Sequence, residues 1–250
     1  MCCHRKGRLL GMIQFGTPPL AYYDGILMRA NPTLHREAFD LLRTRIPPSA
    51  KVVDVGSGQG AFAARLRDAG YHVTSIDKNH DDFRAKDIDF VCVDFDSASD
   101  IEAFRTEHEA RYDVAIGMEV IEHVENPWEY TRFLLSLVKP GGVVMITTPN
   151  AESVQSRVEF LFTGFFAHFQ KGDYEGSGHI NPLTFHELFL ISKGAGAEIL
   201  DAQSVCPLPW IIVSKRLSTT LGSILGSLFR PFAGGKAKGD IICLILKKPY

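Results

Sequence analysis

Short apolar runs alternate with helical segments along most of this chain, and this alternation limits its fold more than any other feature. The strand-like runs are 51–55, 71–76, 90–93, 112–117, 143–148, 197–205 and 240–247, and the helical segments are 61–69, 101–109, 127–138 and 184–193. Strands that alternate with helices through short turns pair in parallel, with right-handed crossovers. Runs that are apolar throughout indicate a sheet that is covered on both faces. We therefore expect an α/β fold.

The order of these segments is typical of a doubly wound, Rossmann-like domain, with a mostly parallel seven-stranded sheet and helices on both faces. A chain of 250 residues is long enough for one such domain and short for two. We expect an N-terminal extension at 1–30 and a single domain at 31–250. This domain should carry two insertions, at about 151–181 and about 208–238.

Charge and cysteine content bear on the partner and the compartment. The chain has 27 Lys and Arg against 29 Asp and Glu, a net charge of −2. Proteins that bind nucleic acid usually carry a basic excess, so we expect a small-molecule or lipid-like acceptor instead of nucleic acid. Cys92, Cys206 and Cys243 lie in apolar, strand-like contexts, which favours reduced side chains in a cytoplasmic protein. The oligomeric state is left open.

A glycine loop follows the first strand-like run and opens a helix. It reads Asp54-x-Gly56-x-Gly58-x-Gly60, with Ser57 inside it. Glycine permits the tight turn and lets a ligand lie against the backbone, and the helix start offers unpaired N–H groups. Dinucleotide-binding proteins use a related loop with a different spacing. Here the acidic Asp54 would repel a pyrophosphate and attract the ammonium group of a methionine moiety, which favours a methionine-bearing nucleoside.

Residues at the ends of the next strands complete the expected cofactor site. Asp77 lies about 20 residues beyond the loop, where a carboxylate can accept both ribose hydroxyls, and Lys78 is its neighbour. Asp94 could accept from an adenine amino group, and Phe95 could pack on the ring. Met118 ends the fourth run at the same edge. The alternative is that the carboxylates only form local turn hydrogen bonds.

These features together resemble the class I S-adenosylmethionine-dependent methyltransferases. Residues 52–60 resemble the first motif of that superfamily, and Asp77 resembles its acidic ribose ligand. Residues 138–142, Val-Lys-Pro-Gly-Gly, resemble its later Lys-Pro-Gly-Gly signature. The resemblance extends from about residue 34 to residue 205. It implies an enzyme that transfers a methyl group from S-adenosylmethionine, with its ligands at the carboxyl ends of the strands.

The motif Glu119-x-x-Glu122-His123 follows the fourth strand-like run, where the methyl acceptor should lie. Without a metal, His123 is a candidate general base beside Glu122; the alternative is that the imidazole merely packs. The motif resembles two families, the O-methyltransferases of ubiquinone biosynthesis and the small-RNA 2′-O-methyltransferases. The second family adds a later His and holds a divalent metal. That resemblance implies that Glu119, Glu122, His123 and His179 hold Mg²⁺ or another divalent ion. We expect His168, among phenylalanines, to pack rather than to ligate.

The acceptor class follows from the residues after His179. The segment 180–185 lacks the Phe-Glu-Trp-Thr-Arg pattern of the RNA enzymes. We therefore expect O-methylation of a small or amphiphilic acceptor, such as a quinone precursor, a phenol or a lipid-linked glycan. RNA 2′-O-methylation is the alternative enzymatic hypothesis. A non-catalytic cofactor-binding subunit or a membrane-surface scaffold is the alternative from another class.

Both insertions are apolar. The segment 158–169 is rich in phenylalanine and could form a lid that excludes water over the acceptor. The segment 208–232 has apolar residues at helical spacing with cations at its flanks, so it could be an amphipathic helix that lies on a membrane. It is too often interrupted by charge to span one. The alternatives are that the two segments pack on each other or form a dimer seam.

Overall fold

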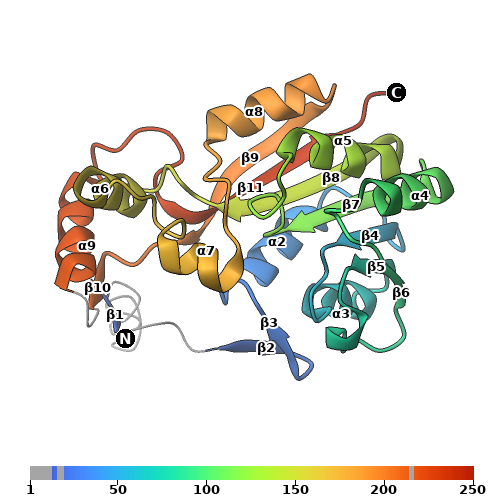
Figure 1. The fold of residues 1–250 in the computed structure, drawn as a ribbon, viewed down its shortest axis with the longest axis horizontal. Helices are drawn as coiled ribbons and strands as arrows, with labels where there is room; N and C mark the ends of the chain where they lie inside the picture. The colour runs from blue at the N-terminus through green and yellow to red at the C-terminus, as the bar shows by residue number, and fades with distance from the viewer. Residues whose placement is uncertain (1–12, 16–19, 214–216) are drawn as a thin grey trace, which may run out of the picture.

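The computed structural model describes residues 13–15, 20–213 and 217–250. A seven-stranded sheet forms its centre, in the order β6-β5-β4-β7-β8-β11-β9 (Figure 1). Its strands are β4 (Lys51–Val55), β5 (His72–Asp77), β6 (Asp89–Cys92), β7 (Tyr112–Met118), β8 (Val138–Pro149), β9 (Glu198–Pro207) and β11 (Gly239–Lys247). Strand β11 runs antiparallel to both β8 and β9, and the pairs among β4 to β8 are parallel. The predicted α/β fold with a mostly parallel seven-stranded sheet is confirmed.

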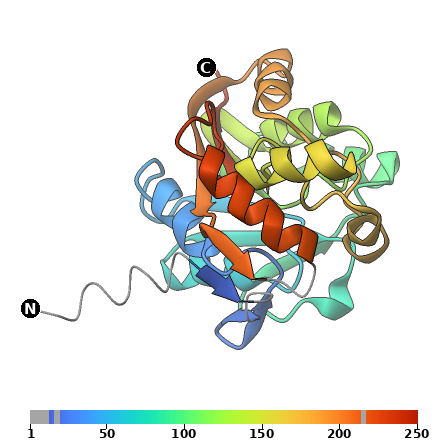
Figure 2. The same cartoon turned by 90° about the vertical axis from the view of Figure 1, so that its left-hand side faces the viewer.

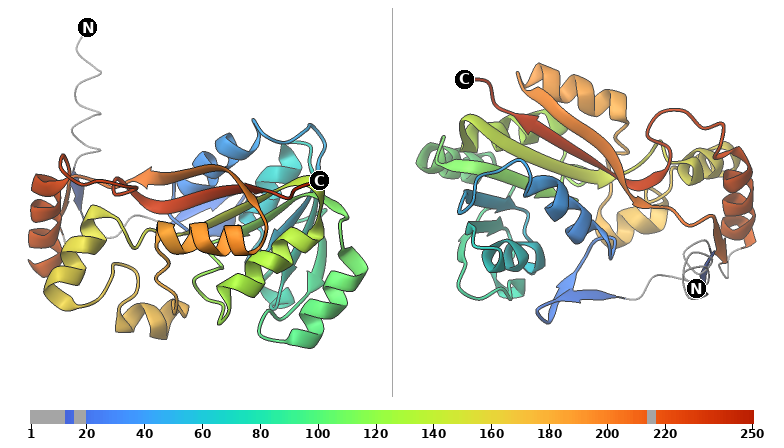
Figure 3. Two further views of the ribbon diagram at one scale, coloured as in Figure 1. Left: turned by 90° about the horizontal axis from the view of Figure 1, so that it is seen from above. Right: turned by 180° about the vertical axis from the view of Figure 1, so that it is seen from behind.

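Helices cover both faces of this sheet. They are α2 (Leu34–Leu42), α3 (Ala61–Asp68), α4 (Ala98–His108), α5 (Pro127–Leu137) and α8 (Phe185–Gly194), with a 3₁₀ turn at His80–Asp82. Helices α2 and α3 lie on one side of the sheet and α4, α5 and α8 on the other (Figure 3). Separate apolar clusters fill the two sides, one around Phe133 and Leu134 and the other around Leu34 and Leu66. This two-sided burial explains why the strands are apolar throughout.

The strand order reverses between β4 and β7. In open α/β sheets, ligands bind at such a reversal, beyond the carboxyl ends of the strands. The glycine loop follows β4 and the Glu119 turn follows β7. The topology therefore places the two predicted functional motifs side by side.

The predicted insertions fold as helices and a strand at one end of the molecule. Helices α6 (Val154–Thr163) and α7 (Lys171–Ser177) lie between β8 and α8, and β10 (Ile211–Val213) and α9 (Leu217–Phe229) lie between β9 and β11. Helix α6 contacts α9 (Figure 2). The sequence prediction treated 208–232 as one helical segment, whereas a strand precedes the helix here. No helix in the described parts of the chain is long and apolar enough to cross a membrane.

The described part of the first thirty residues contains three short strands. Strand β1 (Ile13–Phe15) pairs in parallel with β10, so the extension joins the second insertion. Strands β2 (Ala21–Tyr23) and β3 (Ile26–Met28) form a hairpin whose buried side chains pack against α3. The strands are too short for their periodicity to be detected in the sequence.

Candidate cofactor and acceptor site

The glycine loop turns sharply between β4 and α3. Gly56 has a φ of +78°, and a Cβ atom there would lie 2.5 Å from Val120 Cγ2. Gly60, at the start of α3, has a φ of +86°, and its Cβ would lie 2.5 Å from Phe83 Cε2. Neither backbone conformation nor space admits a side chain at these positions. Glycine is therefore required at both for steric reasons.

Asp77 lies against this loop, and its role as the ribose ligand stays a prediction. Its Oδ2 accepts a hydrogen bond from the backbone N–H of Gly58 at 2.8 Å, and its Oδ1 accepts from the N–H of Asn79 at 3.1 Å. The carboxylate is half-buried at the carboxyl end of β5. Its neighbour Lys78 points to solvent, with Nζ 3.7 Å from Asp96 Oδ2.

Asp54 and Ser57 each have a buried polar atom that no described residue satisfies. Asp54 is 2% exposed, and its Oδ2 has no hydrogen-bond partner among the described residues. The buried Ser57 Oγ is likewise without a partner there. Burial and the nearby charge of Asp77 raise the pKa of Asp54 to about 7. Buried polar atoms without partners are rare, and these fit a ligand that brings a donor such as an ammonium group.

The remaining predicted cofactor residues lie at the same edge of the sheet. Asp94 follows β6, where its Oδ1 accepts from the N–H of Asp96 at 3.0 Å. The ring of Phe95 lies 6.2 Å from that of Tyr130. Met118 is half-buried at the end of β7. Asp94 thus makes the local turn contact that was the alternative prediction, and direct contact of these three with the cofactor stays a prediction.

Glu119 stands in a strained turn directly after β7. Its φ of +54° is uncommon outside glycine. Two contacts with Thr147 of β8 hold it: the N–H of Glu119 donates to Thr147 Oγ1 at 3.1 Å, and that hydroxyl donates to Glu119 Oε1 at 2.8 Å. Burial raises the pKa of Glu119 to about 7. Strain of this kind concentrates at functional sites, and sequence reasoning missed Thr147 because the pairing spans two strands.

Glu122 is fully buried, with an exposure of 0%. Neither of its carboxylate oxygens has a hydrogen-bond partner among the described residues. Its Oε1 lies 3.9 Å from His123 Nε2. Burial and the charge of Glu119 raise its pKa well above the ordinary range. A buried carboxyl without a partner is costly, so this residue calls for a proton or for a ligand in the acceptor site.

Three of the four predicted metal ligands come together. Glu122, His123 and His179 each offer one ligand atom, and these atoms lie within 4.8 Å of one another. Glu119 is not in this group of described residues, and its Oε1 accepts a hydrogen bond from Thr147 Oγ1. Burial lowers the pKa of both histidines, which favours the neutral imidazoles that act as bases or ligands. The donor set suits a divalent ion.

His168 lies beside this group and is held by Asp240. Its Nε2 lies 3.0 Å from Asp240 Oδ1. Burial alone would lower the pKa of His168, but the hydrogen bond and charge of Asp240, with a smaller effect of Glu119, raise it to about 9. The side chain is 43% exposed, and it ion-pairs rather than packing among the phenylalanines. Neither sequence nor spacing signalled this pair.

The phenylalanine-rich segment lies only partly over the site. The ring of Phe169 is 5.5 Å from that of His179. Phe160 stacks on Phe166 at 4.5 Å, while Phe162 and Phe165 are exposed. A lid role therefore rests on Phe169, and the other rings face outward or each other.

Comparison with known proteins shows what the chain resembles. A family described as "Methyltransferase domain" matches residues 28–202. The ubiquinone biosynthesis O-methyltransferase of Xanthomonas axonopodis pv. citri is 27% identical over 190 residues, covering 74% of this chain and 78% of the relative. The protein of the same name from Rickettsia bellii is 35% identical over 132 residues, covering 50% and 54%. A SAM-dependent methyltransferase structure from Archaeoglobus fulgidus superimposes with a TM-score of 0.63 at 18% identity, covering 88% of this chain and 96% of that one. The chain therefore belongs to the methyltransferase domain family and is a class I S-adenosylmethionine-dependent methyltransferase.

Proposed function

We propose that this enzyme transfers the methyl group of S-adenosylmethionine to an oxygen of a small or amphiphilic acceptor. A catechol or another phenol of the quinone-precursor type fits best. The observation that carries the proposal is the buried Glu122, whose two oxygens have no hydrogen-bond partner in the described part of the chain, beside His123 and His179. The names of the relatives in Xanthomonas and Rickettsia support transfer to oxygen.

The cofactor lies along the carboxyl ends of β4 and β5 in this proposal. Asp77 accepts the ribose hydroxyls, and ionised Asp54 balances the ammonium group of the methionine moiety. The N–H groups of the loop glycines donate within the protein, to Ile76, Ser57 and Asp77, so the glycines contribute by letting the cofactor lie close to the backbone. Since the loop and Asp77 already touch through Gly58, the site is largely formed before the cofactor binds.

The acceptor hydroxyl loses its proton beside the turn that follows β7. Neutral His123 accepts this proton while the oxygen attacks the methyl carbon in line. If a divalent ion such as Mg²⁺ binds, Glu122, His123 and His179 hold it, and its charge lowers the pKa of the hydroxyl. Phe169 limits the access of water to this point.

Methyl transfer to a panel of catechols, phenols and RNA 3′ ends tests the proposal. Wild-type protein should methylate a catechol such as 3,4-dihydroxybenzoate or its polyprenylated analogue. The His123→Ala variant should lose about 10²- to 10⁴-fold in rate while its Kd for S-adenosylmethionine stays unchanged. Transfer to RNA alone would establish the alternative acceptor. Full activity of His123→Ala would remove the proposed base.

Elemental analysis and Mn²⁺ titration test the metal part separately. We expect one bound divalent ion, lost in His179→Ala and retained in Glu119→Gln, because Glu119 bonds to Thr147 instead. Loss of the ion in both variants would show that Glu119 is also a ligand, as in the four-ligand arrangement. If the active wild type holds no ion, the metal site is excluded and His123 acts only as the general base.

The end of the molecule formed by α6, α9, β1 and β10 is the proposed contact with a lipid surface. Residues 208–238 contain five Lys or Arg and no Asp or Glu, and α9 has no charged residue. Exposed apolar side chains lie on these elements or within three residues of them: Ile13, Phe15, Phe160, Leu161, Phe162, Phe165, Trp210, Val213, Leu221, Ile224, Leu228, Phe229 and Phe232. An apolar surface with cationic flanks matches an anionic bilayer, where an amphiphilic acceptor would be found.

Sedimentation with phosphatidylcholine vesicles, with and without phosphatidylglycerol, tests this contact. Binding should need the anionic lipid and fall with salt. The double variant Leu228→Ser/Phe232→Ser should bind weakly, whereas Leu200→Ser on β9 should bind like wild type. Equal binding by all three proteins would contradict the proposal. A wild-type dimer that the double variant loses would instead identify a dimer seam.

A further inference from the structure

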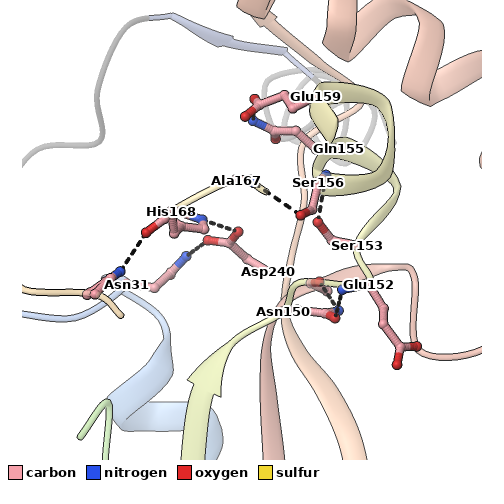
Figure 4. Close-up of polar contacts among 12 residues, drawn as sticks. Asn31, Asn150, Glu152, Ser153, Gln155, Ser156, Glu159, Ala167, His168 and Asp240 are labelled. Carbon is pink, nitrogen blue, oxygen red and sulfur yellow. Dashed lines mark hydrogen bonds and ion pairs between the residues drawn. The ribbon is translucent and has the colours of Figure 1, made fainter. Parts of the chain in front are cut away.

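His168 lies between α6 and α7, and its side chain and its backbone face different partners. Its imidazole Nε2 lies 3.0 Å from Asp240 Oδ1, at the start of β11. Its backbone carbonyl accepts a hydrogen bond from Nδ1 of His179 at 2.7 Å. Figure 4 shows the imidazole of His168 turned toward the carboxylate of Asp240. One residue therefore connects the central sheet with the acceptor site.

The contact is anchored on both sides. Asp240 Oδ2 accepts from Asn31 Nδ2 at 3.1 Å, and the backbone carbonyl of Asp240 accepts from the N–H of Asn150 at 2.8 Å. On the other side, the N–H of Ala167 donates to Ser156 Oγ of α6 at 3.1 Å (Figure 4). Both members of the pair are thus held by hydrogen bonds that do not involve the acceptor site.

The backbone of His168 is in an unusual conformation. Its φ is +66°, the left-handed region that residues other than glycine seldom occupy. Such a conformation persists only where surrounding contacts impose it. The ion pair with Asp240 holds the side chain, and the bond from Ala167 to Ser156 holds the preceding residue. Together they set the direction of the carbonyl.

The carbonyl of His168 determines which ring nitrogen of His179 carries the proton. A carbonyl oxygen only accepts hydrogen bonds, so Nδ1 carries the proton of the neutral imidazole and Nε2 is left with its lone pair. The hydrogen bond at one ring nitrogen sets which nitrogen acts as base or ligand. The ring of His179 lies 4.8 Å from that of His123. Its Nε2 is therefore the atom available to the site.

We propose that His168 and Asp240 are positioning residues, whose ion pair holds the carbonyl of His168 where it fixes the orientation and the tautomer of His179. The inference rests on the proposed function, in which His179 lies beside the reacting hydroxyl. It extends the acceptor site to β11 and, through Asn31, to the segment that precedes α2.

The variant His168→Asn tests the proposal, because Asn keeps the carbonyl and tolerates a left-handed backbone but removes the imidazolium. Asp240→Asn removes the other charge. Lys171→Gln is the matched control, since it removes an exposed cation of α7 that pairs with Glu175 at 3.7 Å. Four quantities are measured in each protein. They are the ring ¹⁵N shifts of His179, the Kd for S-adenosylmethionine, and the kcat and KM with 3,4-dihydroxybenzoate. The variant His179→Ala assigns the NMR signals.

We expect His179 to be Nδ1-protonated in wild type and Lys171→Gln, and mixed or exchanging in His168→Asn and Asp240→Asn. The kcat of these two variants should fall about tenfold to a hundredfold, with the Kd for S-adenosylmethionine within about twofold of wild type. An unchanged His179 tautomer in both variants would overturn the proposal. So would equal losses of kcat and cofactor affinity, which indicate general loosening. If wild type methylates no catechol, the acceptor proposal fails while the NMR result still decides this one.

Discussion

At the scale of single residues, the candidate site is marked by buried carboxyl groups whose oxygens lack hydrogen-bond partners among the described residues. They are Asp54, through Oδ2, and Glu122, through both oxygens, and burial raises the pKa of both. Such groups lower the stability of the ligand-free protein. The presence of these carboxyl groups is explained if the cofactor and the acceptor supply the missing hydrogen-bond partners.

The substitution Asp54→Asn should therefore stabilise the ligand-free protein at neutral pH and above. A carboxyl with a raised pKa stays protonated in the folded state while the unfolded state ionises. Stability then falls as pH rises from about 4 to about 7 and is level above that. The variant should gain up to about 4 kcal/mol at pH 8, since one pKa unit corresponds to about 1.4 kcal/mol, and little at pH 4.

Urea denaturation at pH 4 and pH 8 measures this difference. The fully exposed Asp81 provides the control variant Asp81→Asn, whose stability should follow that of wild type at both values. Asp54→Asn should also bind S-adenosylmethionine more weakly. A variant that is no more stable than wild type at pH 8 would show that the Asp54 carboxyl is satisfied in the ligand-free protein.

The substitution Gly56→Ala should lower the free energy of unfolding for two reasons: the positive φ at this position and the contact of the new Cβ with Val120. Gly56 and Gly164 have nearly the same φ, +78° and +76°, but only Gly56 has Val120 in the way of a Cβ. Gly164→Ala therefore measures the backbone cost alone, about 1–2 kcal/mol. Gly56→Ala should lose about 1–3 kcal/mol more through overpacking. Equal losses in thermal or urea unfolding would exclude a steric role for Val120.

At the scale of elements, hydrophobic pattern and caps predicted most of the fold. The apolar runs located all seven strands of the central sheet, because strands that are covered on both faces are mostly apolar. Helix α5 was predictable from Asn126-Pro127, a cap followed by proline at the first helical position. Helix α7 was not, because Gly172 and Gly176 lower its helix propensity.

The cap of α5 offers a test at this scale. Asn126 Oδ1 accepts from the N–H of Glu129 at 3.1 Å, and α5 packs its buried face on the sheet. Asn126→Ala should cost about 1 kcal/mol of unfolding free energy. Ser97→Ala is the comparison, since Ser97 caps α4 through a longer bond of 3.3 Å to Asp100. A cost at Asn126 no greater than at Ser97 would show that the cap adds nothing to α5.

At the scale of the whole molecule, the sequence predicted the location of the site better than its contacts. The loop at Gly56 and the turn at Glu119 were identified because each directly follows a strand, and parallel strands bring their carboxyl ends to one edge. The bonds from Thr147 to Glu119 and from His168 to Asp240 join segments far apart in the chain. No local pattern encodes such pairs, so they emerged only from the folded chain.

The central claim is that S-adenosylmethionine binds at the carboxyl ends of β4 and β5, held by the glycine loop and Asp77. Isothermal titration of wild type, Asp77→Ala and the exposed control Asp81→Asn tests it most directly. We predict saturable one-to-one binding by wild type and by Asp81→Asn. Asp77→Ala should bind about 10- to 100-fold more weakly, as expected for the loss of charge-assisted hydrogen bonds. Absence of binding by wild type, or equal affinity in all three proteins, would contradict the account.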